Sequence, residues 1–265
     1  MPIQLEDLGS IHGLPAEIKS NLQRLVVDRR GISEDAFMRT ECILGYVCPG
    51  DHYRLGRDGF TQDATGNLPE IPKAVEPAHT VLNGRWDSDI DFVSEEANIL
   101  GGNGCYTLPD GEDELCIRQA EPNPEHLAYY GGRLVRVGDA LRFDTDAPLP
   151  VTEISIGKTY AVDFLLKSAN GGGEFLETHD RPHFHMPLDE EVEGHLFIGK
   201  RDADGLTKIS AFQIPYGFGI MMPPWVIHAD SHLVGRYLVV YSVTKTFSTV
   251  TIRKSNGDFA QISVV

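Results

Sequence analysis

Hydrophobic and polar positions follow two different patterns along this chain of 265 residues. Between residues 15 and 46 the apolar side chains recur at roughly helical spacing, and Gly31 interrupts the run, which predicts two helices. The apolar positions are Ile18, Leu22, Leu25, Val26, Phe37, Ile43 and Leu44. From about residue 125 onward the pattern changes to short segments rich in β-branched and aromatic residues, which is typical of strands.

The expected strands lie close together in the last half of the chain. They fall within residues 127–132, 133–143, 152–167, 194–200, 207–214, 235–243 and 247–254. The Asp202–Gly205 segment, Asp-Ala-Asp-Gly, indicates a hairpin turn between two of them. Many short strands with frequent turns predict a mostly β fold, an antiparallel barrel or jelly roll, with the N-terminal helices packed outside it. We expect the barrel to span 151–265 and a helical and strand extension to span 1–150.

Composition excludes several classes of protein. Hydrophobic residues make up 41% of the chain, so a sizeable core is available. The net charge of −16 argues against binding nucleic acid or anionic membranes. The four cysteines show no CxxC spacing, and the N-terminus lacks the pattern of a signal peptide. We therefore expect a cytoplasmic protein with a small-molecule substrate, no nucleic acid or membrane partner, and homodimer assembly.

Three histidines carry the clearest chemical signal. His183 and His185 stand two apart on a predicted strand, so both imidazoles point to one face, while Phe184 points into apolar packing. His228 follows a Pro-Pro turn and returns a third imidazole to the same end of the predicted barrel. Together they predict a site for one divalent transition metal. Taken alone, the first two could instead be a surface pair without metal.

The spacing around these histidines resembles the two motifs of the cupin superfamily, G-x5-H-x-H-x3,4-E-x6-G and G-x5-P-x-G-x2-H-x3-N. Every spacing of the second motif is kept, with tryptophan in place of the usual glycine and histidine in place of the usual asparagine. Its positions are Gly217, Pro223, Trp225, His228 and His232. The first motif keeps His183 and His185. The resemblance covers residues 151–265 and implies a cupin-type jelly-roll barrel that holds Fe, Mn, Zn, Co or Ni.

The glutamate of the first motif does not keep the family spacing. Counting three or four residues after His185 gives Asp189 or Glu190. Alignment of the apolar triplet at 196–198 with the strand that follows the family's glutamate selects Glu193 instead, with Glu191 as the alternative. We expect Glu193 to be the fourth ligand.

Other polar residues surround the expected ligands. His179 and Arg181 continue the two-residue spacing of the histidine pair, so they could also face the interior. Arg181 is either a clamp for a substrate carboxylate or phosphate, or a salt-bridge partner of Asp189 or Glu191.

Two of these acidic and basic side chains are candidates for proton transfer, and two aromatic residues for substrate binding. His195 and Glu191 are the catalytic candidates, and a hydrogen-bonded core histidine is the alternative for His195. Tyr216 and Trp225 are candidates for substrate binding, with a purely structural role as the alternative.

Three functions fit this combination. The first is a metal-dependent isomerase, epimerase or lyase that moves protons on a small hydroxy- or keto-compound, such as a carboxylate or a sugar. The second is a non-haem Fe(II) dioxygenase, and the third is a non-catalytic ligand-binding protein. The number of titratable residues near the expected ligands favours the first.

Overall fold

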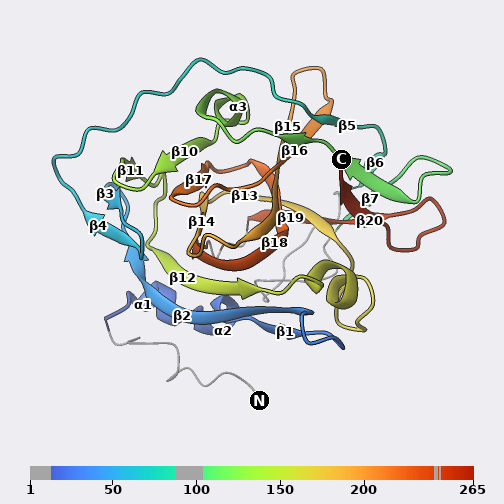
Figure 1. Cartoon of the computed structure of the whole chain (residues 1–265), viewed down its shortest axis with the longest axis horizontal. Coiled ribbons are helices and arrows are strands. Elements are labelled where there is room, and N and C mark those ends of the chain that lie inside the picture. The colour runs from blue at the N-terminus through green and yellow to red at the C-terminus, as the bar shows by residue number, and fades with distance from the viewer. Residues whose placement is uncertain (1–12, 88–103, 242–243, 245) are drawn as a thin grey trace.

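The structure is a computed structural model that describes residues 13–87, 104–241, 244 and 246–265. The first 12 residues and the end of the strand expected at 235–243 lie outside them. Strands dominate, as expected, and the helices are short (Figure 1). The helices are α1 (Ala16–Lys19), α2 (Leu22–Leu25), α3 (Pro124–Tyr129) and the π-helical turn η2 (Tyr160–Leu165).

The strands in the first 150 residues are β1 (Asp28–Arg30), β2 (Phe37–Val47), β3 (His52–Leu55), β4 (Phe60–Gln62), β5 (Thr80–Leu82), β6 (Arg85–Asp87), β7 (Gly104–Thr107), β8 (Glu114–Ile117), β9 (Gln119–Ala120), β10 (Arg133–Arg136) and β11 (Ala140–Arg142). Those that follow are β12 (Leu149–Ile156), β13 (Phe175–His179), β14 (His183–Pro187), β15 (Glu193–Arg201), β16 (Thr207–Phe212), β17 (Phe218–Met222), β18 (Ile227–Val240), β19 (Phe247–Arg253) and β20 (Gln261–Val264).

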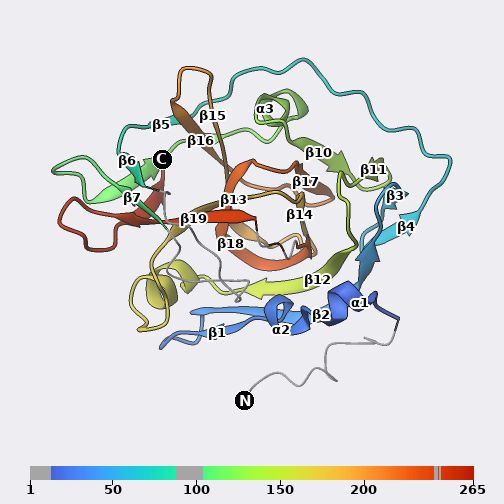
Figure 2. The same ribbon diagram turned by 180° about the vertical axis from the view of Figure 1, so that it is seen from behind.

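Two rows of strands share the long strand β18. One row runs β2, β12, β18, β14, β17 and β10, and the other runs β19, β13, β18, β15 and β16. β18 belongs to both because its 14 residues curl around the centre of the molecule, as Figures 1 and 2 show. Within the described residues the main path of strands ends at β1 and β6 without closing, so the pairings do not show a closed barrel.

The expectation of a helix across residues 37–46 is wrong, because this segment is strand β2. It pairs with β12 from Met38 to Val47, and the pairing contains two bulges. Each bulge adds a residue to β2, so the buried positions are spaced two, three and then four residues apart, which imitates a helical pattern. The buried positions are Met38, Thr40, Ile43 and Val47. Only the part before it is helical, in α1 and α2.

The first 150 residues also contribute to the main sheet. β2 pairs with β12, β10 with β17, and β7 with β19. The helices α1 and α2 pack on Ile43 of β2 through a small apolar cluster. The described part of the N-terminal region is therefore more strand than helix, and it extends the same sheet.

The strand expected at 127–132 is also wrong, because its first half lies in helix α3 and the rest forms a turn. Pro124 occupies the first turn, and the side chain of Asn123 accepts a hydrogen bond from the backbone N–H of His126 at 2.8 Å. Both features favour a helix start. Gly131 then takes a positive φ of 78°, which ends the helix.

The strands around the expected site are confirmed. Five of the expected segments overlap observed strands, namely β12, β15, β16, β18 and β19. Residues 160–165, however, form η2 instead of continuing β12. The hairpin turn between β15 and β16 is present, because the N–H of Asp202 donates to the carbonyl of Leu206 at 2.8 Å. Phe184 points away from its neighbouring histidines and packs edge-to-face on Phe60 and Phe143.

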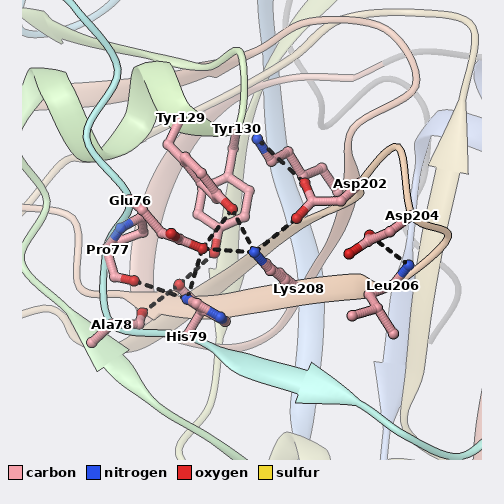
Figure 3. A network of polar contacts seen from close by, with 12 residues as sticks. Glu76, Pro77, Ala78, His79, Tyr129, Tyr130, Asp202, Asp204, Leu206 and Lys208 are labelled. Atoms are coloured by element: carbon pink, nitrogen blue, oxygen red, sulfur yellow. Dashed lines mark hydrogen bonds and ion pairs between the residues drawn. The ribbon is translucent and has the colours of Figure 1, made fainter.

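A long segment with little regular structure, residues 63–79, runs around the outside of the strands from β4 to β5 (Figures 1 and 2). Its end is held to β16 by ionic contacts, shown in Figure 3. Lys208 Nζ lies 2.7 Å from Glu76 Oε1 and 2.8 Å from Asp202 Oδ2, and Tyr129 donates to the same Glu76 oxygen at 2.9 Å. The hydrogen bonds from Lys208 and Tyr129 lower the pKa of Glu76. These contacts lie on the outer surface, away from the site described next.

Candidate metal site

Four side chains able to bind a metal lie together where β13, β14 and β18 meet. The ligand atoms of Glu177, His179, His183 and His228 all lie within 4.8 Å of one another. The three histidines are buried, whereas the side chain of Glu177 keeps 27% of its surface exposed. The group is therefore inside the protein and reaches solvent on the side of the carboxylate.

The backbone explains why these four residues meet. Glu177 and His179 are two apart on β13 and share a face, and Glu177 pairs directly with His228 on β18. The chain then bends at 180–182, where Pro182 cannot donate to a strand partner. β14 begins after the bend with His183, whose ring centre lies 4.3 Å from that of His179.

His228 has the tautomer that a metal ligand requires. Its Nδ1 donates to the backbone carbonyl of Val226 at 2.9 Å, so the second ring nitrogen, Nε2, faces the cluster. Metal-binding histidines commonly donate their other N–H in this way, which fixes the ring and its tautomer. Nε2 lies 3.4 Å from Glu177 Oε1, so a cation could replace a proton between them.

The electrostatics also suit a cation. Burial, aided by the charge of His228, lowers the pKa of His179 to about 3, and burial also holds the pKa of His183 well below its usual range. Both imidazoles are thus neutral near pH 7, the form that binds metals. Burial alone would lower the pKa of His228, but the hydrogen bond and the charge of Glu177 outweigh it and raise that pKa.

A second layer of polar side chains lies behind the four ligand candidates. His185 is fully buried, and its Nε2 lies 3.5 Å from Oδ2 of buried Asp230. Burial would raise the pKa of Asp230, but the contact with His185 lowers it. Arg29 adds a positive charge that acts on Asp230, and its Nη1 donates to the buried Tyr160 Oη at 3.0 Å.

The structure brings together only part of the expected ligand set. His183 and His228 belong to the group, whereas His185 lies behind it, 5.8 Å from His183 between ring centres, and contacts Asp230. Glu193 does not fit its expected role, because its side chain is 60% exposed and pairs with Lys158 at 3.1 Å. The carboxylate in the group is Glu177.

The catalytic candidates also lie elsewhere. Glu191 is exposed and borders a surface cavity of about 560 Å³. His195 pairs across the strands with His232, whose ring lies 4.9 Å from that of Phe197. An extra residue in β18 between Ala229 and His232 puts these rings on the face of the sheet opposite His228.

The substrate-binding candidates occupy three separate places. Arg181 forms an ion pair with Asp146 in the loop before β12, so it has a protein partner, although not the one expected. Tyr216 is 37% exposed beside Arg57 and borders the surface cavities. Trp225 adjoins the site through its backbone, because its backbone N–H donates to the backbone carbonyl of His179 at 2.7 Å.

Sequence reasoning missed Glu177 and Asp230. The signal for Glu177 was available, because it stands two residues before His179 and continues the same alternation toward the N-terminus. Asp230 likewise stands two residues after His228. Both residues could have been found by continuing the two-residue spacing, before His179 for Glu177 and after His228 for Asp230.

Comparison with protein-family models, curated proteins and solved structures gives no match to this chain. Among the described residues, no helix combines the length and apolar character needed to cross a membrane.

Proposed function

We propose that this chain is a metal-dependent enzyme with a cupin-type jelly roll, which transfers protons on a small hydroxy- or keto-compound. The observation that carries the proposal is the buried group of Glu177, His179, His183 and His228. Three imidazoles and one carboxylate are donors that suit Fe, Mn, Zn, Co or Ni. Ligand atoms around one tetrahedral metal lie roughly 3.4 Å apart, so small side-chain rotations from 4.8 Å would suffice.

The strand order supports a jelly roll. The rows β12, β18, β14, β17 and β13, β18, β15, β16 are both antiparallel and each has four strands, as in the two sheets of a jelly roll, although here they share β18. The four ligand candidates lie where the two rows meet, because β13 belongs to one row, β14 to the other and β18 to both.

The ligand spacing supports the cupin resemblance in a form different from the one the histidine pair suggested. Glu177-x-His179-x3-His183 has the spacing of H-x-H-x3-E in the first motif, with the histidine and glutamate exchanged between its two ends. Gly171 stands six residues before Glu177, where the motif has its first glycine. His228 keeps its place in the second motif, so the four ligand positions of the two motifs coincide with the group, although Glu190 stands where the first motif has its last glycine.

A bound divalent metal would supply Lewis-acid activation of a substrate carbonyl or hydroxyl group. The protein would supply the acid–base groups, and the buried pair of His185 and Asp230, directly behind the ligands, replaces His195 and Glu191 as the candidate for relaying a proton. Arg29, which donates to Tyr160, adds a fixed positive charge that acts on Asp230, and this charge favours an anionic or oxygen-rich substrate over a cationic one.

The test is proton exchange measured with defined metals. The purified protein is loaded with Mn, Zn or Fe(II) and incubated in D₂O with a panel of small 2-hydroxy and 2-keto acids and aldoses. We expect metal-dependent deuterium incorporation at the carbon next to the carbonyl or hydroxyl group of at least one compound, observed by NMR. His183→Asn is the matched control, which should lose both metal and exchange. Bound metal with no exchange would contradict the proton-transfer proposal.

The donor set favours one alternative, a non-haem Fe(II) dioxygenase, because neutral imidazoles and a carboxylate also suit Fe(II). Oxygen consumption with the Fe(II) form and none with the Zn form would establish this alternative. Activity with Zn, which is redox-silent, would exclude it. Tight binding of a panel compound with neither result would leave the ligand-binding function.

A further inference from the structure

Trp225 lies on the loop between β17 and β18, which passes next to the strands that carry the three histidines of the candidate metal site. The loop leaves β17 at Met222, which pairs with His183, and enters β18 just before His228. Its backbone is tied to the third histidine, because the N–H of Trp225 donates to the carbonyl of His179 at 2.7 Å. The backbone of Trp225 is therefore fixed beside the strands that carry the three histidines.

Two features of Trp225 are costly unless they serve a purpose. Its φ is +69°, which makes it the single residue other than glycine with a positive φ in the described part of the chain. This conformation is disfavoured for any residue with a Cβ, and local strain of this kind is concentrated at functional sites. The indole is also 59% exposed, although it is the largest apolar side chain that proteins have.

We propose that Trp225 forms one wall of the entrance to the metal site and selects substrates that carry a flat, apolar ring face. The proposal rests on the metal site of the proposed function and narrows its substrate class. An exposed indole stacks on the face of an aromatic ring or on the C–H face of a saturated ring. A ring bearing a metal-binding oxygen group could contact the indole and the ligand group together.

The first experiment tests the position of the indole. The chain has two tryptophans, and Trp86→Phe leaves Trp225 as the one source of tryptophan fluorescence. Titration with Cu(II) should then quench this fluorescence with a stoichiometry of one ion per chain. In the double variant Trp86→Phe, His228→Asn, the same titration should leave it unquenched. Fluorescence that survives stoichiometric metal binding would show that the indole is distant from the site and would overturn the proposal.

The second experiment tests selection. Acetate, cyclohexanecarboxylate and benzoate present the same carboxylate with no ring, a saturated ring and an aromatic ring. Calorimetry with the Zn-loaded protein should show binding roughly two- to tenfold tighter for the ring compounds than for acetate. Trp225→Ala should remove this preference, Trp225→Phe should keep part of it, and both should retain one metal per chain.

Tyr216→Ala is the matched control, because Tyr216 is another exposed aromatic residue and contacts Arg57 away from the site. It should keep the ring preference. A preference for benzoate alone would indicate an aromatic substrate, and an equal preference for cyclohexanecarboxylate would indicate a saturated ring such as a sugar. An unchanged preference in Trp225→Ala would overturn the role of Trp225 while leaving the metal site intact. Failure to bind any metal would instead overturn the proposed function.

Discussion

The same pair of residue types occurs on the two faces of one sheet, with different consequences. Glu177 and His228 lie 3.4 Å apart on one face, and Glu174 and His232 lie 2.8 Å apart on the other. The first pair is joined by two more histidines and is partly open to solvent. The second is enclosed, because Glu174 is fully buried and also accepts from the N–H of Ile262 at 3.0 Å.

The difference shows that neighbours decide what a glutamate–histidine pair can do. At Glu174 the protein's own donors satisfy the same carboxylate oxygen twice, and that oxygen ties β18 to the C-terminal strand β20. At Glu177 the nearest groups are imidazoles: Nε2 of His228 lies 3.4 Å away, and burial lowers the pKa of His179 and His183, so both are neutral near pH 7. The first arrangement stabilises the fold, and the second suits a cation.

The largest expected effect separates the two faces by metal content. His228→Asn should reduce bound metal from one per chain to almost none, because it removes one of four ligands. His232→Asn should retain the metal. Elemental analysis after dialysis measures both variants, and circular dichroism checks that each is folded. Equal metal content in the two variants would contradict the ligand group.

The next effect identifies the carboxylate. Glu177→Gln should weaken metal binding by on the order of 100-fold, since a charged ligand becomes a neutral amide. Glu193→Gln should leave the affinity unchanged, because that side chain is exposed and pairs with Lys158. Competition against a chelating dye measures both affinities. The reverse result would restore Glu193 as the ligand.

On the opposite face the expected effect is on stability. Glu174→Ala should lower the free energy of unfolding by about 3 kcal/mol, because two buried donors lose their acceptor. Metal content should stay at one per chain. Urea unfolding of the metal-free protein measures the loss, and Glu193→Ala serves as a surface control with a change within about 0.5 kcal/mol. A loss of metal in Glu174→Ala would mean that the two faces are coupled.

The smallest effect is a dependence on pH in the metal-free protein. The pKa of His179 falls from 6.5 to about 3 on folding, so below pH 6.5 the unfolded chain binds a proton that the folded chain does not. Protonation of His179 therefore has no effect on the free energy of unfolding above pH 6.5. As the pH falls from 6.5 toward 3, this histidine lowers the free energy of unfolding by about 1.4 kcal/mol per pH unit. His179→Asn should reduce this slope in urea unfolding at pH 6 and pH 5 without abolishing it, because burial also lowers the pKa of His183. An equally steep slope in the variant would show that another group causes it.

Much of the fold follows from local sequence patterns. The hairpin of β15 and β16 was predictable because its apolar strands flank a turn segment, and the mostly β class because such segments fill the second half of the chain. The strand β2 was not, because its two bulges are set by pairing with β12, more than a hundred residues away. Local spacing cannot reveal where a distant partner strand adds a residue.

The candidate site shows the same limit. His183 and His228 were found from their spacing, and both belong to the group. His185 was expected beside them, but the bend at 180–182 turns β14 so that His179 takes that place. His195 was expected near the metal because it shares a face with Glu193, and the extra residue in β18 reverses the face of its partner His232.

That extra residue has a consequence for insertions and deletions in the strand. From Ala229 to His232, β18 spans three steps while β15 spans two, from Phe197 to His195. Removal of Ser231 would equalise the two counts, restore regular alternation and leave both histidine pairs on their present faces. In an ordinary strand, deletion of one residue would move every later side chain to the opposite face. At this point the deletion would only remove the bulge.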